Sequence, residues 1–575
     1  MGLGFLTLVL VAYLVSDNWA RACEKDKLDA CRAAQVARAP GPGTLVLPLG
    51  VSVQSGFPIV TADVHCSSGV MYDLDGDSKQ EAIFGASQGP GTGNVQRSFD
   101  SVWAVKGDGK CLAKWPITIP SHVCSGPAVG DITSASSGVE VVFGSNQDPG
   151  DTQYQPDHRV YAVDKDGSPV SGFPKELGAG KVMGIPTLAD IAGDSKLEIL
   201  AGTAGYWTKN QLTGVVTQYS GKIVGLDGSG SYVSGWNKTL TNQIVINSAA
   251  VGDLYQDGQS YVGVEVVFVV TEYTNPTGMQ IYPTYSQKIY VFQKDGTAMC
   301  SLDLDNDNNA ERCHKVGFGA SSPAIGKLKA YTDAKIKSNL VVLMEDRFIG
   351  SGDSTGKIKV YHIESVNNVL TLVEDYSKTA SEQTATCTND SSDEGKYYDT
   401  FVSSPCIADL DNDTHNEVVA FSRNGQLYVV YYNPGPPGSW VCRNKIVVTC
   451  ASTETPCSNL KMGGPIAVDI DNDGDLEIIV SAFQPRAGGD PYIRVYDYDT
   501  TSPYIHDKFG IQLDSNVAST IFAGNMDADT KVEIVAPAYN FGGRVWAYEF
   551  DNSVYNSSAG WWCECGNAAR TSCAD

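Results

Sequence analysis

The sequence has few of the residues on which catalysis and nucleic-acid binding depend. It holds seven histidines among 575 residues, and no G-x-S-x-G, H-E-x-x-H or phosphate-binding loop motif occurs in it. Lysine and arginine number 41 against 66 acidic residues, which gives a formal net charge of −25. This balance argues against a nucleic-acid partner, because such binding needs basic patches. We therefore expect binding rather than catalysis, although an enzyme that gathers its residues from several repeats would leave no local motif.

Long hydrophobic runs are also missing, with one exception near the start. The apolar run Leu6–Val15 is followed by Ala-Arg-Ala at 20–22. About ten residues are too few to span a bilayer, and the small residues are typical of signal-peptide cleavage, so residues 1–22 are assigned as a signal peptide. Cys23 allows a lipoprotein as the alternative, although Arg21 fits a lipobox poorly. We expect a secreted protein with no membrane insertion after signal removal.

What the sequence has in abundance is glycine, at 59 residues, and short β-branched and aromatic runs that recur at regular intervals. Eight such runs lie 52 to 69 residues apart, and several lead into an Asp-Gly turn, as a strand entering a hairpin does. The runs begin at Val102, Val160, Ile223, Ile289, Ile358, Leu427, Ile493 and Val545. Small residues, a loop that is often acidic and a β-branched stretch precede each run, and a Ser-Gly-aromatic marker follows some of them. One repeat therefore supplies about four short strands.

Four strands in each of eight repeats predict an all-β fold, a β-propeller of eight four-stranded blades, with seven blades as the alternative. A Ser-Gly-Phe-Pro marker at 55–58 stands before the first full repeat. We therefore expect Leu45–Ile59 to add the outer strand of the last blade and close the ring, which leaves no open sheet edge; a linear array is the alternative. The propeller is assigned to residues 45–551, between a cysteine-containing segment at 23–44 and a Cys-rich tail at 552–575.

Four repeats carry an acidic loop of the form D-x-D-x-D-x-x-x-E or a close variant. Carboxylates at positions 1, 3, 5 and 9 of a tight loop converge on one point and repel one another without a cation, and calcium takes about six to eight oxygen ligands. The predicted calcium ligands are Asp73, Asp75, Asp77 and Glu81; Asp409, Asp411, Asp413 and Glu417; Asp469, Asp471, Asp473 and Glu477; and Asn525, Asp527, Asp529 and Glu533. Strands follow where an EF-hand would have a helix, so an EF-hand is excluded. Solvated acidic turns without metal are the alternative.

Two further copies of the loop are incomplete. One has Ala192 at the third position, and the other runs into a longer loop before its glutamate. The weaker calcium candidates in these copies are Asp190, Asp194, Glu198, Asp253 and Asp257. The copies that begin at Asp131 and Lys327 keep too few acidic residues for a metal site.

The loops, with their leads and following strands, resemble FG-GAP repeats, the units of integrin α-subunit propellers and related VCBS-type secreted proteins. The segment Asp73–Gly85, which ends in Ile-Phe-Gly, carries this pattern, and the resemblance runs from about Gly50 to Asp551. It implies calcium bound in blade loops as structural staples, and ligand binding on a propeller face.

Fifteen cysteines, all after the proposed cleavage site, indicate an oxidising compartment, and the odd number leaves at least one free or paired between chains. Two pairs stand 13 residues apart at matching places in their repeats, and a third pair is a further candidate. The predicted disulfides join Cys111 to Cys124, Cys300 to Cys313 and Cys387 to Cys406. Glycosylation sequons lie at Asn237, Asn389 and Asn556.

Three functions are consistent with these features. The first is an extracellular adhesion or ligand-binding module whose partner is a protein or glycan. Its expected binding surface consists of the long insertions Asn210–Gln218, Glu272–Ser286 and Glu374–Lys396. The alternatives are a calcium-dependent enzyme similar to polysaccharide lyases, with a basic residue in the channel, and a structural component of an extracellular coat.

Overall fold

The computed structural model describes most of the chain from Leu47 onward. The described residues are 47–61, 68–86, 100–121, 123, 125–134, 138–145, 158–178, 180–205, 207–209, 216–218, 221–258, 263–274, 284–303, 321–347, 354–366, 369–379, 387–388, 404–422, 426–446, 461–483, 492–499, 504–513, 519–527, 529–537, 544–557, 560–563, 566–567 and 573–574. The predicted signal peptide and the segment 23–44 lie outside them, as do most residues of the long insertions. The described residues form strands and no helix, so none of them forms a helix that could cross a membrane.

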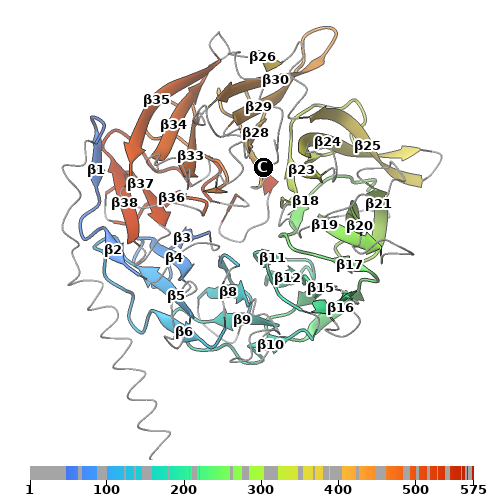
Figure 1. The fold of residues 1–575 in the computed structure, drawn as a ribbon, viewed down its shortest axis with the longest axis horizontal. Helices are drawn as coiled ribbons and strands as arrows, with labels where there is room; N and C mark the ends of the chain where they lie inside the picture. Colours follow the sequence, from blue (N-terminus) through green and yellow to red (C-terminus); the bar gives the residue numbers. More distant parts are fainter. Residues whose placement is uncertain are drawn as a thin grey trace, which may run out of the picture.

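The main strands of the described residues form eight antiparallel sheets arranged as blades around a ring (Figure 1). In blades 1 to 7, four main strands pair in chain order, whereas in blade 8 the fourth place belongs to a strand from the N-terminal end of the propeller. The first strand of a blade lies nearest the centre of the ring. Blade 1 contains β3 (Val70–Tyr72), β4 (Glu81–Ala86), β5 (Asp100–Val105) and β6 (Ile117–Ile119). Blade 2 contains β7 (Ala128–Gly130), β8 (Glu140–Gly144), β9 (Arg159–Val163) and β10 (Lys175–Glu176). Blade 3 contains β11 (Thr187–Ala189), β12 (Glu198–Gly202), β15 (Lys222–Leu226) and β16 (Tyr232–Thr239). The chain that connects β12 to β15 forms a separate hairpin of β13 (Trp207–Lys209) and β14 (Val216–Gln218).

The next four blades carry additional short strands. Blade 4 contains β18 (Ala250–Gly252), β19 (Glu265–Thr274), β20 (Thr284–Gln293) and β21 (Ala298–Asp303), with β17 (Gln243–Ile244) on β19. Blade 5 contains β22 (Ala324–Gly326), β23 (Asn339–Arg347), β24 (Ser354–Val366) and β25 (Val369–Thr379), with β39 (Cys573–Ala574) on β22. Blade 6 contains β27 (Cys406–Ala408), β28 (Glu417–Phe421), β29 (Gln426–Asn433) and β30 (Ser439–Ile446), with β26 (Cys387–Thr388) on β30. Blade 7 contains β32 (Ile466–Val468), β33 (Glu477–Phe483), β34 (Tyr492–Tyr498) and β35 (Ile505–Gln512), with β31 (Lys461–Met462) on β33.

Blade 8 closes the ring from both ends of the propeller. Its strands are β36 (Phe522–Gly524), β37 (Val532–Pro537), β38 (Arg544–Phe550), β1 (Val51–Val53) and β2 (Ile59–Val60). Val51 lies opposite Phe550 and Ile59 lies opposite Val545, so the N-terminal strands pair with β38. The prediction of an eight-bladed propeller closed by an N-terminal strand is therefore confirmed.

The core lies between neighbouring blades. Every residue of β4, β8, β12 and β28 is buried, because a middle strand has a blade packed on each of its two faces. Rim strands such as β16 are exposed or half-buried at nearly every position, and Trp236 is the one buried residue of β16. The buried apolar residues form six clusters, each of which joins strands of adjacent blades. Packing therefore runs around the ring and fixes each loop relative to the next.

The Ser-Gly-aromatic markers connect one blade to the next. A Cβ atom on Gly172 would lie 1.8 Å from the carbonyl oxygen of Ser229 in the next blade's hairpin, and φ of Gly172 is +92°. Only glycine fits such a position. In the marker of blade 3, the aromatic residue also makes a hydrogen bond: Trp236 Nε1 donates to the carbonyl of Lys294 in blade 4 at 2.8 Å. The markers recur because each repeat must make this contact with its neighbour.

The predicted disulfide between Cys387 and Cys406 is wrong. Cys406 is a free, fully buried thiol in β27, the first strand of blade 6. Cys387 pairs in register with Cys442 of β30, at the opposite edge of the same sheet, and Cys442 is disulfide-bonded. Cys111 is also disulfide-bonded, whereas its predicted partner and Cys313 lie outside the described residues. The error arose because spacing along the chain says nothing about which sheet edge a cysteine occupies.

Candidate metal centres

Each acidic loop connects the first and second strands of its blade, and its first aspartate shapes the turn. In blade 7, Asp469 Oδ1 accepts the backbone N–H of Asn472 at 2.6 Å, and Oδ2 accepts that of Gly474 at 3.3 Å. Asn472 and Gly474 have φ of +63° and +100°. Asparagine and glycine tolerate this left-handed region better than other residues. The sequence therefore folds into a tight loop with its carboxylates turned inward.

The glutamate that ends each loop anchors the loop to the sheet. Glu477 is 1% exposed, and its Oε2 accepts the backbone N–H of Ile470 at 2.8 Å. Equivalent bonds join Glu81 to Leu74, Glu140 to Ile132, Glu198 to Ile191, Glu265 to Leu254, Glu417 to Leu410 and Glu533 to Met526. Burial raises the pKa of Glu477 to about 8 and that of Glu417 to about 9. This glutamate is thus an anchor in seven blades, including those with incomplete loops.

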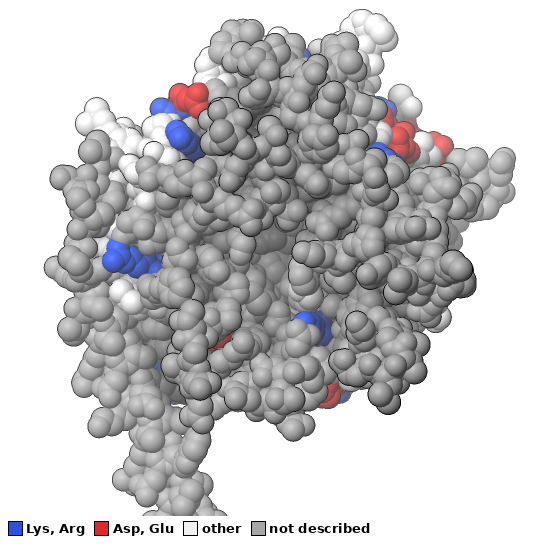
Figure 2. Space-filling view, in the orientation of Figure 1, with Lys and Arg blue, Asp and Glu red and all other residues white. Residues whose placement is uncertain are grey.

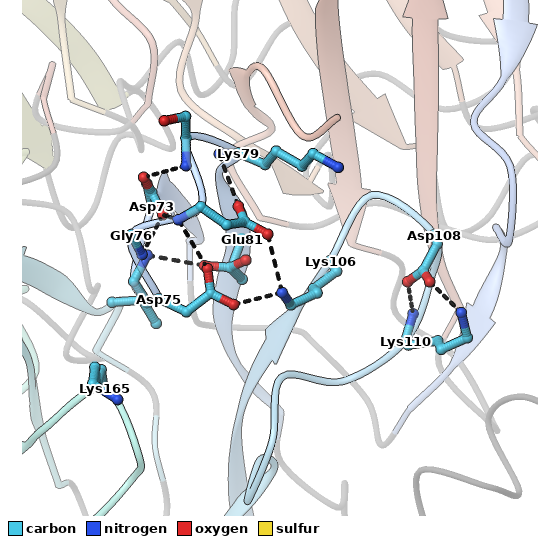
Figure 3. Close-up of polar contacts among 12 residues, drawn as sticks. Asp73, Asp75, Gly76, Lys79, Glu81, Lys106, Asp108, Lys110 and Lys165 are labelled. Carbon is cyan, nitrogen blue, oxygen red and sulfur yellow. Dashed lines mark hydrogen bonds and ion pairs between the residues drawn. The ribbon is translucent and has the colours of Figure 1, made fainter. Parts of the chain in front are cut away.

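Four loops bring three carboxylates together closely enough to share an ion. In each cluster one oxygen from each residue lies within 4.8 Å of the others. Two oxygens bound to one calcium at about 2.3–2.6 Å can be at most about 5 Å apart, so the clusters have the dimensions of a calcium site. The clusters are Asp73, Asp75 and Glu81 (Figure 3); Asp409, Asp411 and Glu417; Asp469, Asp471 and Glu477; and Asp527, Asp529 and Glu549.

Some predicted ligands take other roles. Asp77, Asp413 and Asp473, at the fifth position, each accept the N–H two residues further along the chain. None of the three belongs to the clusters of the described residues.

In blade 8 the third carboxylate is Glu549 of β38, which lies opposite the predicted Glu533. Asn525, predicted at the first position, donates its side-chain amide to the carbonyl of Asp529 at 2.8 Å.

The incomplete loops do not gather three carboxylates among the described residues. In blade 3, the two oxygens of Asp190 accept the N–H groups of Gly193, Asp194 and Ser195, so the aspartate closes a turn. In blade 4, Gln256 donates to Asp253 at 2.7 Å, which places an amide beside that carboxylate.

A lysine ammonium group already contacts the acidic cluster in three of the four blades. In blade 1, Lys106 lies 2.5 Å from Asp75 (Figure 3). The same ammonium group lies 3.3 Å from Asp77. In blade 7, Lys508 lies 2.6, 2.9 and 2.8 Å from Asp471, Glu477 and Asp497. In blade 8, Lys531 contacts Glu549, Asp551 and Asp529. These loops thus carry a cation of their own.

The loop of blade 6 differs, because no lysine or arginine forms an ion pair with it in the described part of the chain. Asp411 Oδ1 is buried and has no hydrogen-bond partner. Burial, followed by the charges of Asp413 and Asp409, raises the pKa of Asp411 to about 6. The basic side chain at the loop is His415, 3.3 Å from Asp413. An all-oxygen donor set with an unsatisfied buried oxygen fits a calcium ion.

Sequence reasoning missed the cross-strand partner of the anchoring glutamate. In blade 8 this partner is Glu549, paired with Glu533. Lys106 in blade 1 and Asp497 in blade 7 occupy the corresponding place. In each of these blades, the residue after the anchoring glutamate lies opposite the residue that precedes Lys106 or Asp497. All of these residues come directly after the recurring four-residue runs, so the repeat alignment contained the signal.

Blade 5 replaces its acidic loop with a buried hydrogen-bond network. Asp375, with a side chain 5% exposed, accepts from Lys329 at 2.9 Å, Tyr331 at 2.5 Å, Asn339 at 3.2 Å and His362 at 2.7 Å. Burial acts to raise the pKa of Asp375, but the hydrogen bonds from His362, Tyr331 and Lys329 outweigh it and hold that pKa below its usual value. Lys329 supplies here the positive charge that an ion would supply elsewhere.

Comparison with known proteins agrees with this architecture in one segment. Residues 409–480, from the loop of blade 6 to β33 of blade 7, match the FG-GAP-like repeat family. This match confirms the resemblance predicted from the loops. No curated protein matches the sequence.

Solved structures similar to the chain include three rhamnogalacturonan lyases. The exotype lyase YesX is 12% identical and has a TM-score of 0.30; the match covers 86% of this chain and 91% of that one. A Bacillus licheniformis lyase is 12% identical with a TM-score of 0.33, covering 86% and 92%. The lyase YesW is 13% identical with a TM-score of 0.29, covering 88% and 91%. Values this low carry no argument about function.

Proposed function

We propose that this chain, a β-propeller with FG-GAP-type repeats, is a secreted ligand-binding module whose blade loops hold calcium as structural staples. The observation that carries the calcium assignment is the loop of blade 6. Asp409, Asp411 and Glu417 point oxygens at one another within 4.8 Å, and no lysine or arginine of the described residues neutralises them. Carboxylates this close are stabilised by a bound cation or a bound proton, and the donor set suits calcium.

At this site, Asp409, Asp411 and Glu417 would hold the ion. When bound, calcium supplies the positive charge that offsets the three carboxylates. Asp409 shapes the loop through the N–H groups of Asp413 and Thr414, and Glu417 ties it to β28. The ion would thus join the loop to the second strand of the blade, and its effect on the protein is stability.

The four loops should differ in affinity because of their lysines. Calcium binding in blades 1, 7 and 8 must displace Lys106, Lys508 or Lys531 from the carboxylates, and this displacement costs part of the binding free energy. Blade 6 has no such competitor among the described residues. We therefore place the tightest site at Asp409–Glu417.

The expected ligand is an extracellular protein or a glycan. The apolar N-terminal run and the disulfide-bonded Cys111 and Cys442 support an oxidising, extracellular location. On the face shown in Figure 2, the described basic side chains are scattered and do not form one patch, which supports a partner other than nucleic acid. The described residues Trp561, Trp562, Cys573 and Ala574 lie against the central strands, where a propeller enzyme would gather its catalytic residues, and this favours binding over catalysis.

Thermal unfolding with calcium, with magnesium and with EDTA tests the proposal. Calcium at 100 times its dissociation constant should stabilise the chain by about 2.7 kcal/mol, if it binds the folded state alone. Magnesium should stabilise less, because it demands a stricter octahedral geometry. The variant D411N should lose most of the calcium effect while folding normally. Equal melting temperatures in calcium and EDTA would refute the calcium staple, whereas a protein or glycan screen in calcium tests the binding role separately.

A further inference from the structure

The segment that follows blade 8 returns to the middle of the ring. In Figure 1 the chain ends near the centre, beside the first strands of the blades. The described part of this segment consists of residues 560–563, 566–567 and 573–574. Trp561 and Cys563 are each 2% exposed, so the segment is packed into the propeller and not merely laid over it.

The segment binds three blades through backbone hydrogen bonds. Trp561 N–H donates to the carbonyl of Ala467 at 2.8 Å, and Ala467 N–H donates back to the carbonyl of Trp561 at 3.1 Å. Ala523 N–H donates to the carbonyl of Trp562 at 2.9 Å. Further on, Cys573 pairs in parallel register with Ile325. The contacts therefore fall on blades 7, 8 and 5 in turn.

The three docking positions are equivalent. Ala467, Ala523 and Ile325 are each the middle residue of the three-residue first strand of their blade. A first strand pairs with the second strand on one side only, so its other edge presents free N–H and C=O groups. In the described residues, the first strands of blades 1 to 4 have no strand on this edge. The segment thus adds a two-residue strand at blade 5, a single β-bridge at blade 7 and one backbone hydrogen bond at blade 8.

Side chains make the docking selective. A Cβ atom on Gly560 would lie 2.5 Å from the carbonyl oxygen of Ala467, and φ of Gly560 is +102°, so this position requires glycine. Trp561 packs in the core cluster that contains Ala467. Trp562 packs edge-on against Tyr555, with ring centroids 4.9 Å apart. The recognised sequence is a glycine followed by two large aromatic residues.

We propose that the central edges of blades 5, 7 and 8 form a peptide-binding site that works by strand addition, and that the described residues 560–563, 566–567 and 573–574 belong to a tethered ligand that occupies it. Backbone hydrogen bonds supply much of the affinity in strand addition, and side-chain pockets supply specificity. A partner with an extended segment that contains glycine followed by two aromatic residues would bind the same edges by displacing the tethered segment. This inference does not depend on calcium binding.

The test uses the full-length chain and a fluorescent peptide of residues 557–567 with both cysteines replaced by serine. Two variants loosen the tethered segment by different means: W561A removes the buried ring, and G560A introduces the clash with Ala467. The control V554A alters a 45% exposed side chain before the docked segment. Fluorescence anisotropy measures peptide binding, and hydrogen exchange of the Ala467 and Ala523 amides reports whether the tethered segment has left.

We expect the peptide to bind W561A and G560A at least about tenfold more tightly than wild type or V554A, because the tether no longer competes. The peptide should also restore the slow exchange of the Ala467 amide, and a peptide with alanine in place of Trp561 should fail. Rapid exchange of Ala467 in both variants without peptide binding would overturn the proposal, since the edge would then be open yet unable to accept a strand. Unchanged exchange in both variants would overturn it as well, because these contacts would then not hold the segment.

Discussion

The ammonium nitrogen of Lys508 lies 2.9 Å from Glu477 Oε1, while Glu477 Oε2 accepts the backbone N–H of Ile470. One buried carboxylate therefore holds both the acidic loop and a cation from the rim strand β35. This arrangement explains how a loop with the spacing of a calcium site can have part of its negative charge offset without a metal.

Replacing Lys508 by methionine should make blade 7 dependent on calcium. Loss of the ammonium leaves Asp471, Glu477 and Asp497 without their counter-charge, so the free energy of unfolding in EDTA should fall by roughly 2–4 kcal/mol. Calcium should restore this loss and bind with one additional tight site. Denaturant unfolding in EDTA and in calcium, together with calorimetric titration, measures both effects. A loss of stability that calcium does not restore would contradict the proposed competition.

Stability in EDTA should fall as the pH rises through the range in which Glu265 ionises. Burial raises the pKa of Glu265 from an ordinary 4.5 to about 7. The folded state therefore holds a proton that the unfolded chain has already lost, and the stabilisation present below pH 4.5 disappears as the pH rises towards 7. The expected loss is roughly 3 kcal/mol.

The variant E265Q serves as the control, because glutamine keeps an oxygen for the N–H of Leu254 but does not ionise. Its stability should change less between pH 4.5 and 7 than that of the wild type. The measurement is denaturant unfolding at several pH values. Parallel curves for the two proteins would show that Glu265 does not titrate in this range.

Removing Asp375 should destabilise blade 5 regardless of calcium. The variant D375A leaves Lys329, Tyr331 and His362 without their shared acceptor in a buried site, and the expected cost is roughly 3–5 kcal/mol. The milder variant Y331F removes one donor and should cost about 1 kcal/mol. Thermal unfolding in EDTA and in calcium should give the same shift for each variant. A shift that calcium abolishes would show that the network is itself a metal site.

The fold could be predicted from the sequence because its determinants are local and repeated. The eight four-residue runs lie in the third main strand of each blade and are buried except at the half-buried Tyr290, Lys359 and Arg494. The Ser-Gly-aromatic markers are positions such as Gly172 where a neighbouring carbonyl excludes a side chain. The marker at 55–58 indicated closure of the ring. Each of these features is visible within a few residues of the chain.

The sites were only partly predictable, because they depend on contacts between distant residues. Loop spacing identified Asp409, Asp411 and Glu417 in blade 6. It could not show that Lys508 contacts the acidic loop of its own blade 7, some 30 residues earlier in the chain. The position of Cys387 opposite Cys442 in the sheet was missed because it depends on the order of the strands. The docking of Trp561 on Ala467 has no signal in either local sequence.

The most direct test of the account is a calorimetric calcium titration of the wild type beside the matched variants D411N and D471N. The account predicts that tight binding, together with the calcium-dependent rise in melting temperature, is lost in D411N and kept in D471N, because Lys508 already neutralises blade 7. Loss of tight binding in D471N but not in D411N, or no calcium binding by the wild type, would contradict it.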